Sequence, residues 1–246
     1  MSRTAEILSN PALKTFKWKN AKVETLKDEK TGKVLKDEAG IAKQKVVRQS
    51  GWYYWDKSLN DGNGGEVLLE MPFSWVWLES TTSFSGFNKD KGQGVYSNEV
   101  LNTKTQPLTV KCGNETIAEG LYQEIKDEVK GQGGKYCASI YGLMKNKEDE
   151  YEVVRFLMVG SSRDTWMSDS NLQKNKTHCI TYYDVIEKET PKNDVYECPK
   201  FKYMPLDEEF AAEADRVAME VIDPYFKWLQ DKPAVVKEEE TVDGDY

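Results

Sequence analysis

The most regular pattern in the chain is an alternation of apolar and polar residues over 66–79. The apolar residues fall two apart, which is the period of a β-strand with one buried face. We therefore predict a strand here and expect Trp75 and Trp77 to pack in the core. Pro72 has no amide hydrogen to donate, so the strand should lie at an edge or bulge there. The alternating residues are Val67, Leu69, Met71, Phe73, Trp75 and Trp77.

Shorter runs rich in β-branched and aromatic residues predict further strands on both sides of this one. Polar stretches containing glycine separate them, and the sequence NDGNGG over 60–65 is the clearest turn. The predicted strands lie within 13–26, 41–48, 95–101, 108–112, 135–144, 151–160 and 177–186. The predicted loops are 28–40, 80–94 and 161–176.

Two segments have helical periodicity instead. Ile117, Ile125 and Val129 belong to a series at helical spacing, which predicts a helix over 115–130 capped by Asn114. A second helix is expected to begin after Asp207 and to dock on the body through its apolar face. Pro224 should break or kink that helix, with a short helical turn after it.

The order of these elements predicts a mainly β fold with helices (α+β). Strands, one helix and then a strand hairpin form the order of an OB-fold, a five-stranded barrel with its helix between strands 3 and 4. We therefore expect an OB-fold-like domain over 1–204 that binds single-stranded nucleic acid, and a helical segment over 205–232 that docks on it. The remaining residues, 233–246, are polar and acidic and are expected to form a flexible, disordered tail.

Composition supports a globular protein with a real core, because 39% of the 246 residues are hydrophobic and 31% are charged. The first ten residues, MSRTAEILSN, lack an apolar run of signal-peptide length. No uninterrupted apolar run is long enough to span a membrane. We expect a cytoplasmic protein with no membrane partner.

The net charge of −8 argues against a nucleic-acid partner until its distribution is considered. Residues 1–206 carry 30 basic and 29 acidic residues, whereas 207–246 carry 4 basic and 13 acidic ones. The acidity therefore belongs to the C-terminal end. Within the first part, 11–48 holds eleven basic and five acidic residues. These basic residues form either a phosphate-binding strip or a solvated face.

Catalytic and metal-binding motifs are absent from the sequence. There is no phosphate-binding glycine loop with lysine, no H-E-x-x-H and no G-x-S-x-G, so we expect no enzyme and no cofactor. A metal-dependent nuclease is the weakest alternative. Cys112, Cys137, Cys179 and Cys198 are widely spaced and are expected to be free thiols. A zinc site using them and His178 has suitable ligand types but no short ligand spacing.

Aromatic residues crowd into 51–87, which holds four of the seven tryptophans. Such residues are either core or a platform on which unpaired bases stack. Alternation within 52–55 should bury one pair and expose the other. Phe84 and Phe87 lie in a predicted loop, where they either stack on bases or anchor the loop. The candidate DNA-binding residues are Lys14, Lys17, Trp18, Lys19, Lys43, Lys45, Arg48, Trp52, Tyr53, Tyr54, Trp55, Lys57, Phe84, Phe87, Lys89 and Lys91.

The layout resembles the single-stranded-DNA-binding proteins of bacteriophage replication systems. The residues that carry the resemblance are WYYW over 52–55, the SWVWLES strand, the helix ETIAEGLYQEIKDEV and the acidic ending EEETVDGDY. The resemblance implies sequence-tolerant, non-enzymatic binding of single-stranded DNA in phage replication, recombination or repair, in the cytoplasm of an infected bacterium. The tail would recruit a phage DNA polymerase or helicase-primase.

An acidic tail can also mimic phosphates and occupy a basic groove when DNA is absent. The tail candidates are Glu238, Glu239, Glu240, Asp243, Asp245 and Tyr246. The main alternative is a structural or interaction protein, either a virion component or a DNA-mimicking inhibitor of a host factor. The sequence leaves the oligomeric state open, including a homodimer.

Overall fold

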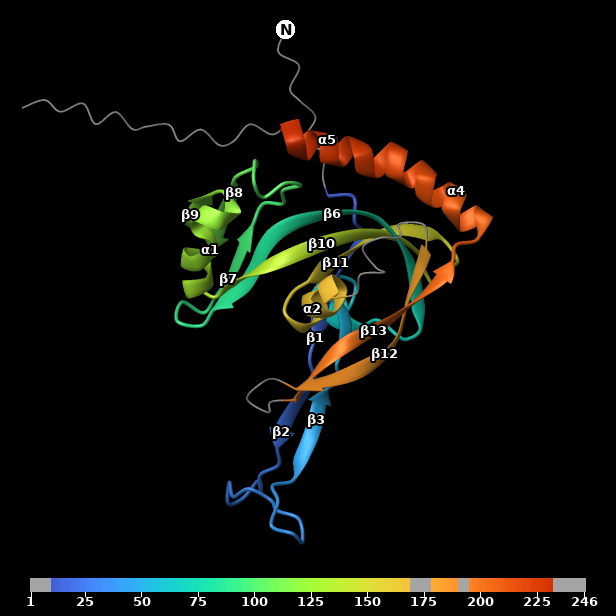
Figure 1. Cartoon of the computed structure of the whole chain (residues 1–246). Coiled ribbons are helices and arrows are strands. Elements are labelled where there is room, and N and C mark those ends of the chain that lie inside the picture. Colours follow the sequence, from blue (N-terminus) through green and yellow to red (C-terminus); the bar gives the residue numbers. More distant parts are fainter. Residues whose placement is uncertain (1–9, 169–177, 190–194, 232–246) are drawn as a thin grey trace, which may run out of the picture.

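The computed structural model describes residues 10–168, 178–189 and 195–231, and it is built mainly from strands with a few helices (Figure 1). The predicted α+β class dominated by strands is confirmed. One 11-stranded sheet has the order β5-β4-β1-β11-β10-β6-β7-β8-β9, with β12 pairing β6 and β13 pairing β12. A separate two-stranded ribbon consists of β2 and β3.

The strands of the large sheet are mostly antiparallel, and β1 and β11 are parallel. Their bounds are β1 Lys14–Lys19, β4 Gly51–Asp56, β5 Gly65–Leu68, β6 Phe73–Asn88, β7 Gln93–Ser97, β8 Leu108–Cys112, β9 Glu115–Gly120, β10 Gly134–Lys145, β11 Tyr151–Met158, β12 His178–Glu189 and β13 Val195–Pro205. A 3-10 turn, Asn60–Gly62, lies between β4 and β5, where the sequence predicts a turn.

The predicted five-stranded OB barrel is wrong, and the length of β6 explains why. This strand has 16 residues and pairs with β10 along most of its length, with β7 near its end and with β12 near its start. The sheet therefore branches at β6 and extends sideways instead of closing after five strands. The predicted loop over 80–94 is also wrong, because β6 continues through its first half and β7 follows a tight turn.

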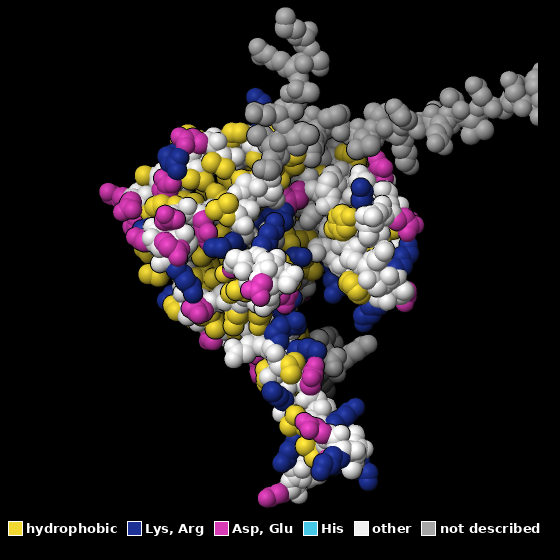
Figure 2. Space-filling model, turned by 180° about the vertical axis from the view of Figure 1, so that it is seen from behind, with side chains coloured by type: hydrophobic (Ala, Val, Ile, Leu, Met, Phe, Trp, Pro, Cys, Tyr) yellow, Lys and Arg dark blue, Asp and Glu magenta, His cyan; other side chains and the backbone are white. Residues whose placement is uncertain are grey.

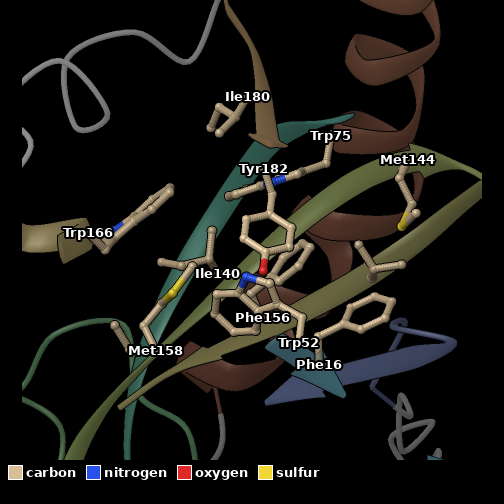
Figure 3. Close-up of a cluster of buried hydrophobic side chains, with 12 residues drawn as sticks. Phe16, Trp52, Trp75, Ile140, Met144, Phe156, Met158, Trp166, Ile180 and Tyr182 are labelled. Atoms are coloured by element: carbon tan, nitrogen blue, oxygen red, sulfur yellow. The ribbon is translucent and has the colours of Figure 1, made fainter. Parts of the chain in front are cut away.

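The core of the curled sheet is aromatic (Figure 3). Trp75 is buried as predicted and stacks on Trp166, with ring centroids 5.5 Å apart. Trp77 is partly buried against the same cluster. The predicted loop over 161–176 contains helix α2, Ser161–Ser168, which carries Trp166 into this core. The cluster centres on Phe16, Trp52, Trp75, Ile140, Phe156, Ile180 and Tyr182.

The helix predicted over 115–130 is shorter than expected. Residues 115–120 form strand β9, which turns back on β8 at Gly113, where φ is +59°. Helix α1, Tyr122–Gly131, begins only after Leu121. Glu124 accepts a hydrogen bond from the Leu121 amide at 2.9 Å, so the predicted Asn114 cap is wrong.

The C-terminal helices begin as predicted. Asp207 caps α4, Glu208–Val217, by accepting a hydrogen bond from the Phe210 amide at 2.8 Å. Pro224 does not break the chain of turns, because a π turn over Ala218–Ile222 leads directly into α5, Asp223–Asp231. Both helices pack on one face of β6, β10 and β11. No helix among the described residues is both long and apolar enough to cross a membrane.

The ribbon of β2, Lys22–Thr25, and β3, Gln44–Arg48, projects from the body (Figure 1). Isolated bridges, Lys27 to Val34 and Lys36 to Ala42, extend its pairing outward. We call residues 21–48 the arm. Its strands agree with those predicted over 13–26 and 41–48, and its outer end is the segment predicted as a loop over 28–40.

Candidate nucleic-acid interface

The outer face of the large sheet, opposite the aromatic core, carries several of the predicted residues. Residues that pair across strands point to the same face, and so do residues two apart along a strand. The register thus places on this face Tyr53 and Trp55 of β4, Lys17 of β1, Leu157 of β11, Ser139 and Lys135 of β10, and Ser85 and Phe87 of β6. Four inter-strand steps of about 4.8 Å separate β4 from β6, about 19 Å in all.

An open hollow of about 750 Å³ lies at the β6 end of this face. Lys17, Lys89, Lys130 and Lys135 line it, with Asp90 as the one acidic residue in the lining. None of the four lysines forms an ion pair with another described residue. The lining also includes Trp18, Phe87, Asn88, Gln132, Leu157 and Val159.

Two glycines form part of the lining beside Phe87. A Cβ on Gly133, where φ is +84°, would lie 2.4 Å from the backbone oxygen of Phe87. A Cβ on Gly86 would lie 2.1 Å from the backbone oxygen of Gly133. The α1–β10 turn and β6 therefore touch backbone to backbone, which only glycine permits. Asn88 donates a hydrogen bond to Gln132 at 2.9 Å and holds the two segments together at the same place.

No protein-family model, curated protein or solved structure matches this chain.

The aromatic candidates divide between core and surface. The alternation predicted within 52–55 is present: Trp52 is buried and Tyr54 packs against the core, while Trp55 is 58% exposed. Phe87 is 56% exposed, but Phe84 is only 3% exposed and stacks on Tyr122 of α1. Trp52 and Phe84 are thus core side chains and offer no ring face for stacking, which corrects their inclusion among the candidates.

Trp18 and Tyr53 are intermediate cases. Trp18 is partly buried, with its ring edge-on to Trp52 and Tyr182, and it borders the hollow. Tyr53 donates a hydrogen bond to the backbone oxygen of Gln49 at 2.9 Å. The ammonium of Lys19 lies over the Tyr53 ring, 5.9 Å from its centroid. Only part of the surface of each ring is therefore available for stacking on a base.

The lysines predicted from sequence include some that are ion-paired in the fold and some that line the hollow. Lys14 pairs with the buried Glu152 at 2.8 Å, Lys19 pairs with Glu66, and Lys91 pairs with Glu115 at 2.7 Å. The hydrogen bond from Lys91 to Glu115 raises the pKa of Lys91, so this group is charged but already engaged. Only Lys17 and Lys89 of the predicted lysines reach the hollow. The others are Lys43, Lys45 and Arg48 on the arm and Lys57 in the exposed turn after β4.

Lys130 and Lys135 line the hollow but were not among the predicted residues. They lie on either side of the glycine-rich segment that ends helix α1. A lysine near a helix C-terminus is stabilised by the helix dipole, so the presence of Lys130 is explained without a binding role. The pairing of Lys135 with Ser85, which brings it beside Phe87, is a long-range register and leaves no local signal.

Beside the hollow, the middle of the outer face is closed by a buried ionic cluster. Glu99, from the β7–β8 connection, pairs with Arg155 at 2.5 Å and accepts hydrogen bonds from Tyr141 and Ser139. Burial raises the pKa of the nearby Cys137 thiol to about 11. All four cysteines are free thiols, as predicted.

The described residues contain no group of three or more His, Cys, Asp or Glu side chains placed to hold a metal ion. The tail candidates Glu238, Glu239, Glu240, Asp243, Asp245 and Tyr246 lie outside the described residues.

Proposed function

We propose that the chain is a non-enzymatic, sequence-tolerant binding protein for single-stranded DNA, with the hollow and the outer sheet face as its binding surface. The observation that carries this proposal is the placement of four lysines, none ion-paired within the described part of the chain, around the exposed Phe87 ring. Proteins that bind single strands combine a basic groove for the backbone with aromatic rings for the bases.

The part of the outer face over β1 and β4 extends this surface beyond the hollow, whereas the Glu99 cluster and the helices α4 and α5 cover the part over the middle of β10. Trp55 lies on the same face as Phe87, four strands away, and Lys17 lies between them. Figure 2 shows dark blue basic, magenta acidic and yellow hydrophobic side chains intermixed on the side of the molecule opposite the view in Figure 1. A strand could thus stack at two places while its phosphates meet lysines between them. The biological setting that we propose for this binding is DNA replication, recombination or repair in a phage-infected cell.

Fluorescence titration with oligo-dT tests the proposal, because stacking on Trp18 or Trp55 should quench tryptophan emission. Each phosphate of a single strand that a lysine neutralises contributes about −0.7 to the slope of log affinity against log salt, so four lysines would contribute about −2.8. Changing Lys17, Lys89, Lys130 and Lys135 to Gln should remove that contribution.

The matched control changes four lysines that line neither the hollow nor the arm, Lys104, Lys111, Lys147 and Lys227, to Gln. This control should bind as the wild type does. Absence of quenching at low salt would reject single-strand binding and favour the alternative of an interaction protein.

A further inference from the structure

The arm is a surface that the proposed single-strand site does not use. Its residues are almost all exposed, and within the described part of the chain it touches the body only near its base (Figures 1 and 2). There the Ala21 amide donates to Ser50 at 2.6 Å, and Arg48 donates to the backbone oxygen of Asn20 at 3.1 Å. A two-stranded ribbon without a core of its own is marginally stable in water, so such an element invites a functional explanation.

The arm has a net charge of +3, because residues 21–48 hold eight basic and five acidic side chains. Asp28 accepts hydrogen bonds from Thr31, Asp37 accepts one from the Ile41 amide at 2.8 Å, and Glu24 pairs with Lys22 at 2.7 Å. Six lysines form no ion pair with another described residue: Lys27, Lys30, Lys33, Lys36, Lys43 and Lys45. Asp28, Glu29, Asp37 and Glu38 offset part of the charge of these lysines and Arg48. This charge suits a polyanion.

The composition of the arm favours a duplex over a single strand. Residues 21–48 contain no Phe, Tyr, Trp or His, so the arm has no ring on which an unpaired base could stack. Its recognition must rely on phosphates and shape. The major groove of B-DNA is about 12 Å wide and admits a two-stranded β-ribbon.

The base of the arm is continuous with the hollow. Trp18, which borders the hollow, donates a hydrogen bond from Nε1 to the side chain of Asn20 at 2.8 Å. The backbone oxygen of Asn20 accepts the hydrogen bond from Arg48 at the root of β3. The root of the arm therefore lies beside the edge of the hollow.

We propose that the arm binds the duplex flank of a junction between single-stranded and double-stranded DNA, while the unpaired strand occupies the hollow. This inference rests on the proposed function and narrows its substrate to junction DNA. The lysines of the arm contact duplex phosphates, and the aromatic side chains of the body contact unpaired bases.

The test compares the full chain on two labelled DNAs, a dT oligonucleotide and a DNA hairpin that carries the same dT sequence as an overhang. The wild type should bind the hairpin junction more tightly. In the triple variant Lys33→Gln, Lys36→Gln and Lys43→Gln, the junction preference should disappear while affinity for dT stays unchanged. Its salt slope on the junction should shrink by about 0.9 for each duplex phosphate that is no longer neutralised, about 2.7 for three.

The matched control is Lys104→Gln, Lys147→Gln and Lys227→Gln, which removes the same charge elsewhere and should keep the junction preference. Equal affinity of the wild type for the two DNAs would overturn the inference about the arm and leave the proposed single-strand binding intact. So would an arm variant that weakens binding to both DNAs equally, because the arm would then bind the single strand.

The arm also exposes Ile41 and Val46. An arm variant with unchanged junction binding but altered self-association in sedimentation would overturn the inference in favour of a protein interface. A wild type that binds neither DNA would overturn the proposed function together with this inference.

Discussion

Two phenylalanines on β6 allow a sharp test of which aromatic rings touch DNA. Phe84 and Phe87 are three residues apart and lie on opposite faces of the sheet. Phe84 is 3% exposed and stacks on Tyr122, whereas Phe87 is 56% exposed beside the hollow. The same substitution, Phe→Ala, should therefore have different consequences at the two positions.

Phe87→Ala should weaken DNA binding and leave the fold intact. Less than half of the side chain is buried, so its removal should cost about 1 kcal/mol of unfolding free energy or less. Removing one base–aromatic stack costs about 1–3 kcal/mol of binding free energy, a roughly 5- to 150-fold weaker affinity.

Phe84→Ala should do the reverse. Truncating a buried phenylalanine costs about 3–5 kcal/mol of stability. The melting temperature should fall by about 6–20 °C for a chain of this size. The molecules that remain folded should bind DNA as the wild type does. Thermal melts and oligo-dT titrations of both variants check this. Wild-type affinity in Phe87→Ala, or equal destabilisation of both variants, would refute the division between core and surface.

Three further predictions follow from buried groups and from the tail. Arg155→Met should leave the Glu99 carboxylate buried without its partner and cost about 3–5 kcal/mol of unfolding free energy in urea melts, and the added change Glu99→Gln should recover part of it. A single variant as stable as the wild type would contradict this. The pKa of Cys137 in the folded state, about 11, lies above its ordinary value of 9.0. The buried thiol therefore makes its full contribution to the free energy of unfolding below pH 9, and this contribution is lost as the pH rises to 11. That decrease is about 3 kcal/mol, and the stability difference between the wild type and Cys137→Ala should shrink by this amount across the window. A difference that stays constant with pH would contradict it. Deleting residues 237–246 should tighten DNA binding at low salt, since an acidic tail competes for a basic groove, and an unchanged affinity would reject that competition.

Local patterns predicted the elements whose periodicity is strong. The alternation over 66–79 correctly placed Trp75 in the core, because the period of a strand determines which side chains share a face. The single strand predicted there is wrong, however: β5 ends at Leu68 and β6 begins at Phe73, after Pro72, which has no amide hydrogen to donate to a sheet. The cap at Asp207 and the strand hairpin of β10 and β11 were likewise predicted from short segments.

Segments whose structure depends on distant partners were not predictable in this way. Residues 115–120 have helical spacing but form β9, because pairing with β8 outweighs local preference. The 80–94 segment is polar and contains glycine, yet β10 pairs with it and extends β6 by many residues. In this extension Phe84 is buried against Tyr122 of α1. The long β6 pairs with β7, β10 and β12, so the sheet branches there instead of closing as a small barrel.

The candidate site shows the same limit. Lys17, Phe87 and Lys135 come from three strands that are far apart in sequence, and only the sheet register brings them to one surface. The sequence identified two of these three residues, from local charge and aromatic density. It could not show which of the basic residues, such as Lys14 and Lys91, have acidic partners in the fold.

The most direct test of the central claim is ultraviolet cross-linking of the full chain to an oligo-dT carrying a photoreactive thymine analogue, followed by peptide mapping. Single-strand binding in the hollow and on the outer face predicts cross-links in the peptides that contain Phe87, Trp18 and Trp55, and these cross-links should vanish at high salt. Absence of cross-links at low salt, or cross-links confined to surfaces away from these residues, would contradict it.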